Sequence, residues 1–282
     1  MTAAALVNYR EIAREIRRRT LVCIGRVGIG HVGGSLSIAE ILAVLYYGKM
    51  RVRPEEPDWA ERDRLVLSKG HAGPALYSVL SMKGYFPEEW LLTLNQPETL
   101  LPSHCDMRRT PGVDMTTGSL GQGASAACGL ALAQKMDGLS ARTYVIFGDG
   151  ELEEGEVWEA FLFAAHHELC NLTAIVDFNN MQIDGTVDEI CSLGDLSGKF
   201  RSFGFGAYEA DGHDPASVKA ALDLADSDGK PSAVICRTVK GRGVSAFEGK
   251  RSSHNAALPP DLLKKCLEEL ERDAESEEGA AG

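Results

Sequence analysis

The sequence contains no apolar run long enough to cross a bilayer, and its first residues lack the charged-then-apolar order of a secretory signal peptide. It also has no Cys-x-x-Cys pair. Its seven cysteines are scattered and odd in number, which disfavours a zinc site and suits a reducing compartment. No internal repeat is present, and only the last ten residues have a biased composition. We therefore expect a cytoplasmic protein that is neither a membrane protein nor a repeat array.

Basic residues are fewer than acidic ones. There are 29 lysines and arginines and 41 aspartates and glutamates, which gives a formal net charge of −12. This balance argues against nonspecific binding to nucleic acid. Basic residues nevertheless gather on one predicted helix, and we expect this face to be solvated or to lie at an interface. Its arginines are Arg10, Arg14, Arg17, Arg18 and Arg19.

The composition, 44% hydrophobic and 25% charged, is that of an ordinary globular protein. A chain of 282 residues is long enough for one large α/β domain with its own core. We expect residues 1–272 to form this domain. Residues 273–282 are acidic, small and turn-rich, and we expect them to form a flexible tail.

Two apolar segments each end in a polar motif. Residues 143–147 run into Gly148-Asp149-Gly150, and residues 172–178 run into Asn179-Asn180. The intervening residues 156–169 have a helical pattern, so the segment predicts a strand-helix-strand unit with two adjacent parallel strands. Both polar motifs then lie at the carboxyl edge of the sheet, where open α/β sheets bind ligands.

The chemistry of these motifs predicts a metal-diphosphate site. Asp149 offers a carboxylate, Asn179 an amide oxygen and Met181 a backbone carbonyl, which together make a partial oxygen shell for Mg²⁺ or Ca²⁺. Gly148 and Gly150 allow phosphate oxygens to approach the backbone closely, because neither has a Cβ. Gly-Asp-Gly alone is also a common surface turn. Its pairing with Asn-Asn after the next strand favours the binding site.

The remaining pattern predicts a three-layer α/β fold with a mostly parallel sheet flanked by helices. Ser37 and Glu40 have capping-box spacing and predict a helix that starts there and ends near residue 47. The other predicted helices are residues 6–27, 121–136 and 215–225, and the other predicted strands are residues 64–67, 208–210 and 232–238. Residues 28–33 match the dinucleotide fingerprint by letter, but a predicted helix precedes them where that fingerprint requires a strand.

The paired Gly-Asp-Gly and Asn-Asn motifs resemble the thiamine diphosphate signature. Four further blocks resemble those of the transketolase family, in the same order along the chain: residues 30–35 (GHVGGS), 68–72 (SKGHA), 114–123 (DMTTGSLGQG) and 211–214 (DGHD). The resemblance implies the thiamine diphosphate-binding fold of that family, with thiamine diphosphate and Mg²⁺ or Ca²⁺ as cofactors.

In the family that this sequence resembles, a full transketolase has three domains in one chain. This chain has room for the first, diphosphate-binding domain. The resemblance therefore implies the N-terminal subunit of a split transketolase. A separate C-terminal subunit would supply the pyrimidine-binding domain and the glutamate that activates the cofactor. Two copies of each subunit would complete two sites. We expect this subunit to be inactive alone.

The resemblance also assigns roles to individual residues. His31, His104 and His254 would line the substrate channel, and His71 and Gly150 would contact the diphosphate beside the metal-binding Asn179. Gly118 and Leu120 would approach the aminopyrimidine, and Ile183 would pack on the cofactor rings. Lys240 would reach the diphosphate, although a solvated lysine is the alternative. Glu154 would join a network between the cofactors of two subunits, whereas Glu159 fits that network or the helix dipole equally well. His166 and His167, in the predicted helix 156–169, are read as structural.

This chain departs from the family at Asn255, where glycine commonly follows the histidine, and at residues 103–106, which read Ser-His-Cys-Asp in place of Gly-His-Pro-Glu.

The implied reaction moves a two-carbon ketol unit from a ketose phosphate to an aldose phosphate, with carbanion chemistry carried by the cofactor. Three alternatives stay open at this point. They are a half-subunit of another thiamine diphosphate enzyme, such as one like deoxyxylulose-phosphate synthase, a non-catalytic paralogue, and a plain nucleotide-binding domain.

Overall fold

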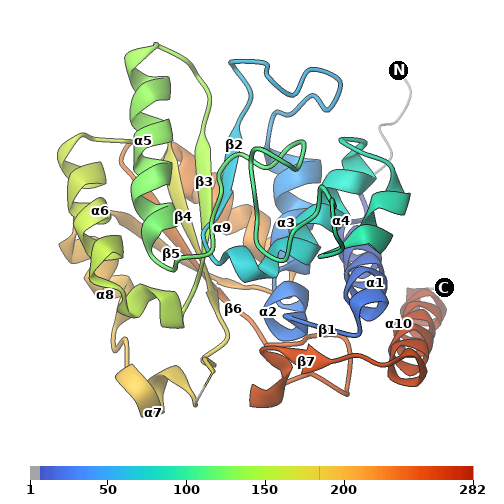
Figure 1. Ribbon diagram of the computed structural model, residues 1–282. Helices are drawn as coiled ribbons and strands as arrows, with labels where there is room; N and C mark the ends of the chain where they lie inside the picture. Colours follow the sequence, from blue (N-terminus) through green and yellow to red (C-terminus); the bar gives the residue numbers. More distant parts are fainter. Residues whose placement is uncertain (1–6, 184, 282) are drawn as a thin grey trace.

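The computed structural model describes residues 7–183 and 185–281, the side chains of 273–281 excepted. At its centre lies a five-stranded sheet with the order β2-β3-β4-β6-β5, in which all four pairings are parallel (Figure 1). The strands are β2 (Arg64–Leu67), β3 (Thr143–Gly148), β4 (Leu172–Phe178), β5 (Gly206–Asp211) and β6 (Ser232–Arg237). The near-continuous apolar and buried sequences of β3, β4 and β6 suit strands that are covered on both faces.

Side chains of successive residues in β3 enter two different cores, because a strand alternates its faces. Tyr144 and Ile146 belong to one core, and Val145 and Phe147 to the other. Helices packed into the first core are α1 (Tyr9–Val27), α2 (Val32–Leu36), α3 (Ala39–Val44), α4 (Gly73–Lys83), α9 (Pro215–Ser227) and α10 (Pro260–Ala281). Those of the second are α5 (Gln122–Met136), α6 (Gly155–His166), α7 (Val187–Cys191) and α8 (Leu196–Ser202). The predicted three-layer α/β fold is confirmed.

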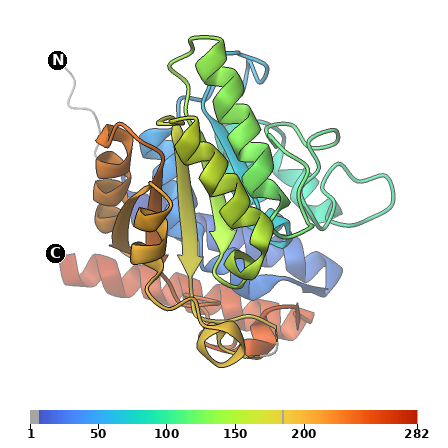
Figure 2. The same ribbon diagram turned by 90° about the vertical axis from the view of Figure 1, so that its left-hand side faces the viewer.

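The helices α5 and α6 pack side by side on the outside of the second core, toward the viewer in Figure 2. Shorter elements connect the layers. They are the antiparallel pair β1 (Ile29–Gly30) and β7 (Ala256–Ala257), a π-helical turn at Leu45–Lys49, and 3-10 turns at Gly70–Ala72, Glu88–Thr93, Gly150–Glu153 and Arg251–Ser253. No described helix has both the length and the apolar character needed to cross a membrane.

The predicted strands are present, and β2 and β4 have the predicted bounds. The predicted helices 121–136, 156–169 and 215–225 correspond to α5, α6 and α9 with ends shifted by up to three residues. The helix α10 continues to Ala281 through residues 273–281, and the flexibility expected of this tail stays a prediction. The domain boundary itself stays a prediction.

The capping box predicted at Ser37 and Glu40 is wrong. The helix α3 begins after Ile38 without a side-chain cap. The Ser37 hydroxyl donates to Asp177 Oδ2 at 2.7 Å, and the Glu40 carboxylate binds the buried Arg17 guanidinium through two contacts of 2.7 and 2.6 Å. Buried charges require partners, and this requirement outweighs a local cap. The Arg17 contact also places this arginine inside the protein, whereas we expected a solvated or interface face.

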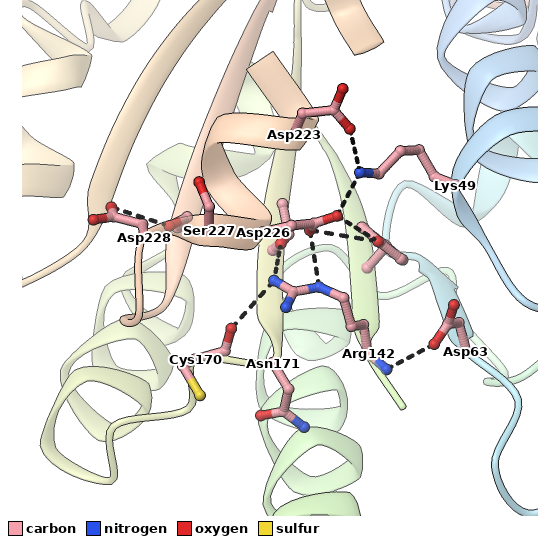
Figure 3. Close-up of polar contacts among 12 residues, drawn as sticks. Lys49, Asp63, Arg142, Cys170, Asn171, Asp223, Asp226, Ser227 and Asp228 are labelled. Atoms are coloured by element: carbon pink, nitrogen blue, oxygen red, sulfur yellow. Dashed lines mark hydrogen bonds and ion pairs between the residues drawn. The ribbon is translucent and has the colours of Figure 1, made fainter. Parts of the chain in front are cut away.

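Paired charges close the amino edge of the sheet (Figure 3). Asp226 of α9 forms ion pairs with Lys49 Nζ at 2.6 Å and with Arg142 Nε at 2.8 Å. The backbone N–H of Arg142 donates to Asp63 Oδ1 at 2.8 Å. These contacts join α9, the π-helical turn and the starts of β2 and β3. The carboxyl edge, which carries the predicted site, lies at the opposite ends of the strands.

Candidate functional site at the carboxyl edge of the sheet

A cavity of about 310 Å³ opens at the carboxyl ends of β2, β3 and β4. Twelve of the thirteen predicted site residues line it. They are His31, His71, His104, Gly118, Leu120, Asp149, Gly150, Asn179, Met181, Ile183, Lys240 and His254. Residues far apart in the sequence therefore meet at the sheet edge where the strand-helix-strand unit places a ligand.

The three predicted metal-ligand oxygens, those of Asp149, Asn179 and the Met181 carbonyl, lie at the ends of β3 and β4. Asp149 is buried and accepts hydrogen bonds from the backbone N–H groups of Gly150, at 2.9 Å, and of Asn180. Asn179 Oδ1 accepts from the Met181 N–H at 3.1 Å. Burial, and then the neighbouring Asp177 carboxylate, raise the pKa of Asp149 to about 7. A buried carboxylate without a cation as ion-pair partner among the described residues is chemically suited to a bound cation.

The residues present fit a hard divalent cation, because carboxylate, amide and carbonyl oxygens are the ligands that Mg²⁺ and Ca²⁺ prefer. Within the described ranges, no group of three or more His, Cys, Asp or Glu side chains is arranged to hold a metal. A metal at this edge would therefore depend on Asn179 and the Met181 carbonyl together with Asp149.

Lys240 is buried beside these oxygens. Its ammonium donates to the Met181 carbonyl at 3.1 Å and lies 3.1 Å from His254 Nδ1. With only 3% of its surface exposed, it is not the solvated lysine of the alternative interpretation. Burial, and then the neighbouring Lys69 ammonium, lower the pKa of Lys240 to about 8, so the side chain keeps its charge at neutral pH.

A fully buried ion pair of Lys69 and Asp177 supports the cavity floor. Lys69 Nζ lies 2.6 Å from Asp177 Oδ2 and also donates to the Gly34 carbonyl at 2.7 Å. Asn179 Nδ2 donates to the same Asp177 oxygen at 2.9 Å. Although burial alone raises it, the pKa of Asp177 is held below its ordinary value by Lys69 and the other donors. Asp177 therefore orients the amide of the predicted metal ligand.

Four histidines converge on the outer part of the cavity. The His31 ring centroid lies 5.1 Å from that of His71, 5.7 Å from that of His104 and 5.4 Å from that of His254. Burial, and then the charges of neighbouring groups, lower the pKa of His31 and His71 below the usual range and the pKa of His254 to about 4. These three rings are neutral at pH 7, so they can exchange hydrogen bonds with hydroxyl groups.

Two apolar side chains and a glycine complete the wall. Leu120 and Ile183 are 38% and 67% exposed and offer apolar contacts for a ring. Gly118 has φ +153°, and a Cβ there would lie 3.2 Å from His104 Cδ2. Glycine at this position therefore allows the backbone to approach His104 closely.

Of the predicted site residues, Glu154 alone is outside the cavity lining. It is exposed at the start of α6, as is Glu159 about one turn further along; the network between subunits stays a prediction for both, with the helix dipole as the alternative for Glu159. His166 and His167 are exposed at the far end of α6. Glu151 lines the cavity instead. It is buried and accepts three hydrogen bonds, and burial raises its pKa while those donors oppose the rise.

Sequence reasoning missed four lining residues with polar or charged side chains, namely Lys69, Glu151, Asp177 and Gln182. A signal was available for two of them. Lys69 lies inside the Ser-Lys-Gly-His block, and Asp177 is the one charged residue of the apolar run 172–178. A charge inside a buried strand requires a partner, which makes it a candidate for a polar network.

Comparison with known proteins adds independent information. The family model described as transketolase, thiamine diphosphate binding domain, matches residues 9–277. The chain is 53% identical to the 6-deoxy-6-sulfo-D-fructose transketolase subunit of Clostridium sp. (strain MSTE9), over 95% of this chain and 98% of the relative. It is 40% identical to an apulose-4-phosphate transketolase subunit of Actinobacillus succinogenes, over 94% and 97% of the two chains.

Solved structures agree with this relationship. The transketolase of Campylobacter jejuni superposes with a TM-score of 0.87 at 34% identity, over 93% of this chain and 42% of that one. The Leishmania mexicana transketolase superposes with a TM-score of 0.89 at 31% identity, over 94% and 41%. The chain thus spans about two fifths of these solved chains but nearly the full length of the relatives named as subunits.

Proposed function

This chain belongs to the transketolase family, as the counterpart of an N-terminal transketolase subunit, and we propose that it transfers a two-carbon ketol unit from a ketose to an aldose together with a separate C-terminal subunit. The observation that carries the proposal is the convergence of twelve predicted site residues on one cavity. A plain nucleotide-binding domain has no reason to gather oxygen ligands, a buried lysine and four histidines at that edge.

The cofactor would be thiamine diphosphate with Mg²⁺, which supplies carbanion stabilisation when bound. Asp149, Asn179 and the Met181 carbonyl would hold the metal. His71, Gly150 and Lys240 would bind the diphosphate, and Lys240 would act as a positive charge screened from water by its burial. Gly118, Leu120 and Ile183 would contact the rings of the cofactor.

The substrate would lie on the histidine side of the cavity. His31, His104 and His254 would orient the sugar by hydrogen bonds to its hydroxyl groups. The rings of His31 and His254 are neutral at pH 7 and so can each donate and accept one hydrogen bond. Orientation of this kind lowers the entropic cost of bringing the reacting atoms together.

The donor is a ketose with an anionic terminus, either a phosphate or a sulfonate. A sulfonated donor is favoured as a second candidate because the subunit named for 6-deoxy-6-sulfo-D-fructose is 53% identical, against 40% and 36% for subunits named for apulose 4-phosphate. A half-subunit like that of deoxyxylulose-phosphate synthase is not favoured, since these full-length relatives are named as transketolase subunits.

The outer face of α5 and α6 supports assembly with other chains. Leu162 and Phe163 of α6 are 58% and 41% exposed, and Met136 of α5 is 78% exposed. Neighbouring exposed apolar side chains of this size mark interaction surfaces. Glu154 and Glu159 lie exposed on the same helix, where a network between subunits would need them. We infer contacts there with a second copy or with the C-terminal subunit, in a dimer of heterodimers in the cytoplasm.

The test is turnover by this chain purified alone, by the pair with a candidate C-terminal subunit, and by the pair carrying Asp149→Asn. Each is given thiamine diphosphate, Mg²⁺ and ribose 5-phosphate, with xylulose 5-phosphate or 6-deoxy-6-sulfo-D-fructose as the donor. We expect turnover by the unmodified pair alone. Turnover by the single chain would refute the need for a partner. A pair that binds the cofactor but accepts neither donor, yet condenses pyruvate with glyceraldehyde 3-phosphate, would move the chain to the synthase class.

A further inference from the structure

Glu151 is an acidic residue that the proposed reaction leaves without a role. It lies in the 3-10 turn that follows Gly-Asp-Gly, and 2% of its surface is exposed. Its Oε1 accepts the Ser68 hydroxyl at 2.5 Å and the Gly121 N–H at 3.0 Å. Its Oε2 accepts the Gly148 N–H at 3.2 Å. No ion-pair partner of Glu151 occurs among the described residues, so these donors stabilise the charge.

The three donors belong to three separate segments of the cavity wall. Ser68 directly precedes Lys69, Gly121 directly follows Leu120, and Gly148 directly precedes Asp149. Ser68 and Gly121 are 83 and 30 residues away from Glu151 in the sequence. One carboxylate therefore joins the end of β2, the start of α5 and the end of β3.

We propose that Glu151 is a positioning residue whose carboxylate holds these three segments at the spacing that the diphosphate and aminopyrimidine contacts require. The identity of this ligand rests on the proposed function. The holding role does not, because it concerns contacts within this chain. A site whose loops are held in place before the ligand arrives binds more tightly, since less ordering accompanies binding.

The chemistry of a carboxylate suits this role. It accepts on both oxygens and donates on neither, so three N–H and O–H groups can converge on it without conflict. Hydrogen bonds to an ionised acceptor are stronger than neutral ones. A glutamine has nearly the same shape, but its amide group faces at least one of these donors with a donor of its own.

The packing around Ser68 and Gly121 leaves these two donors little room to move away from Glu151. A Cβ on Gly123 would lie 2.2 Å from Ser68 Oγ, so the hydroxyl is pressed against α5. Gly121 has φ +90°, a conformation that side chains other than glycine rarely adopt. Loss of Glu151 would therefore leave the buried Gly121 N–H group without an acceptor and remove the acceptor of the partly buried Gly148 N–H.

The experiment compares Glu151→Gln with Asp63→Asn in the full chain. Asp63 is a matched control, since it is equally buried at 2% exposure and accepts the backbone N–H groups of Arg51 and Arg142, at the edge of the sheet away from the cavity. Two quantities are measured. One is amide hydrogen exchange in residues 66–71, 118–122 and 146–151 without cofactor, and the other is the Kd for thiamine diphosphate with Mg²⁺.

We expect Glu151→Gln to speed exchange in all three segments and to raise the Kd roughly tenfold or more, the equivalent of one lost hydrogen bond to a charged group. Asp63→Asn should leave both the hydrogen exchange of the three segments and the Kd unchanged. Equal changes of Kd in the two variants at an equal loss of Tm would overturn the proposal, as would unchanged exchange in Glu151→Gln. If the unmodified chain does not bind thiamine diphosphate, the proposed function fails, while the exchange result still decides the role of Glu151.

Should Glu151→Gln fail to fold, Ser68→Ala decides the matter. It removes one of the three donors, and Ser78→Ala is its control, because Ser78 is also a buried serine and donates to the Pro74 carbonyl within α4. Faster exchange at residues 146–151 and a weaker Kd in Ser68→Ala alone would support the proposal. Identical behaviour of the two serine variants would overturn it.

Discussion

The ammonium of Lys240 lies 3.1 Å from the carbonyl oxygen of Met181, the same backbone oxygen that we expect to bind the metal. A carbonyl oxygen has two lone pairs, so it can accept a hydrogen bond from the lysine and still coordinate a cation. Lys240 is also 3.1 Å from His254, on the substrate side of the cavity. One buried charge thus lies between the metal ligands and the histidines.

We predict that Lys240→Met weakens thiamine diphosphate binding about 10- to 100-fold, because hydrogen bonds to charged groups contribute about 1.5–3 kcal/mol. Isothermal titration calorimetry in the presence of Mg²⁺ measures the change. Lys250→Met is the control, since Lys250 is exposed in the same part of the chain and donates to the Ser245 and Ala246 carbonyls. Equal affinities of the two variants would exclude contact between Lys240 and the diphosphate.

The sheet and most of the cavity could be predicted from the sequence because their signals are local. Apolar runs mark the strands, and the polar motifs lie directly after them, so parallel strands bring Asp149 and Asn179 to one edge. The interactions that were missed join distant residues. The local sequence predicts Ser37 as a helix cap, whereas its partner Asp177 is 140 residues away. Glu151 lies in an acidic stretch typical of a surface turn, and only the fold shows that it is buried.

The depressed pKa of His254 predicts that this residue destabilises the fold in mild acid, whereas the raised pKa of Asp149 acts in the opposite direction. In the unfolded chain this ring takes up a proton near its ordinary pKa of 6.5, whereas in the folded chain it does so near 4. The folded chain therefore binds fewer protons between these values. The contribution of His254 to the free energy of unfolding is fully present above pH 6.5 and is lost as the pH drops toward 4.

His254→Gln should reduce this dependence, so that its Tm falls less than that of the unmodified chain between about pH 7 and about pH 5. Part of the dependence should persist, because the pKa values of His31 and His71 are lowered as well. His166→Gln, on the exposed end of α6, serves as the control and should leave the pH profile unchanged. Parallel profiles for all three proteins would contradict the prediction.

The charge network at the amino edge of the sheet should matter for stability and not for binding. Asp226→Ala leaves the Arg142 guanidinium without its carboxylate and removes one of the two partners of Lys49, and we expect the free energy of unfolding to fall by about 2–3 kcal/mol. Urea unfolding measures this change. Asp223→Ala removes the other Lys49 partner, whose side chain is 49% exposed, and should cost about 1 kcal/mol or less.

Neither substitution should change the Kd for thiamine diphosphate, because the cavity lies at the opposite edge of the sheet. A loss of affinity in Asp226→Ala at a temperature where the variant is fully folded would show that the two edges are coupled. Similar stabilities of the two aspartate variants would show that the partly buried ion pair of Arg142 and Asp226 adds nothing to the free energy of unfolding.

The apolar face of α5 and α6 makes the most direct prediction about assembly. Leu162 on α6 and Leu224 on α9 are exposed to nearly the same extent, 58% and 55%, so aspartate at either position should disturb the fold of the single chain equally little. Only Leu162 lies beside Phe163 on the face that we assign to contacts between chains. An aspartate there would bury a charge against an apolar partner surface. In size-exclusion chromatography with light scattering, we therefore expect Leu162→Asp to abolish or sharply weaken assembly with a second copy or with the C-terminal subunit, while Leu224→Asp assembles normally. Normal assembly of Leu162→Asp would place the contacts between chains elsewhere and leave the exposed side chains of α6 without that role.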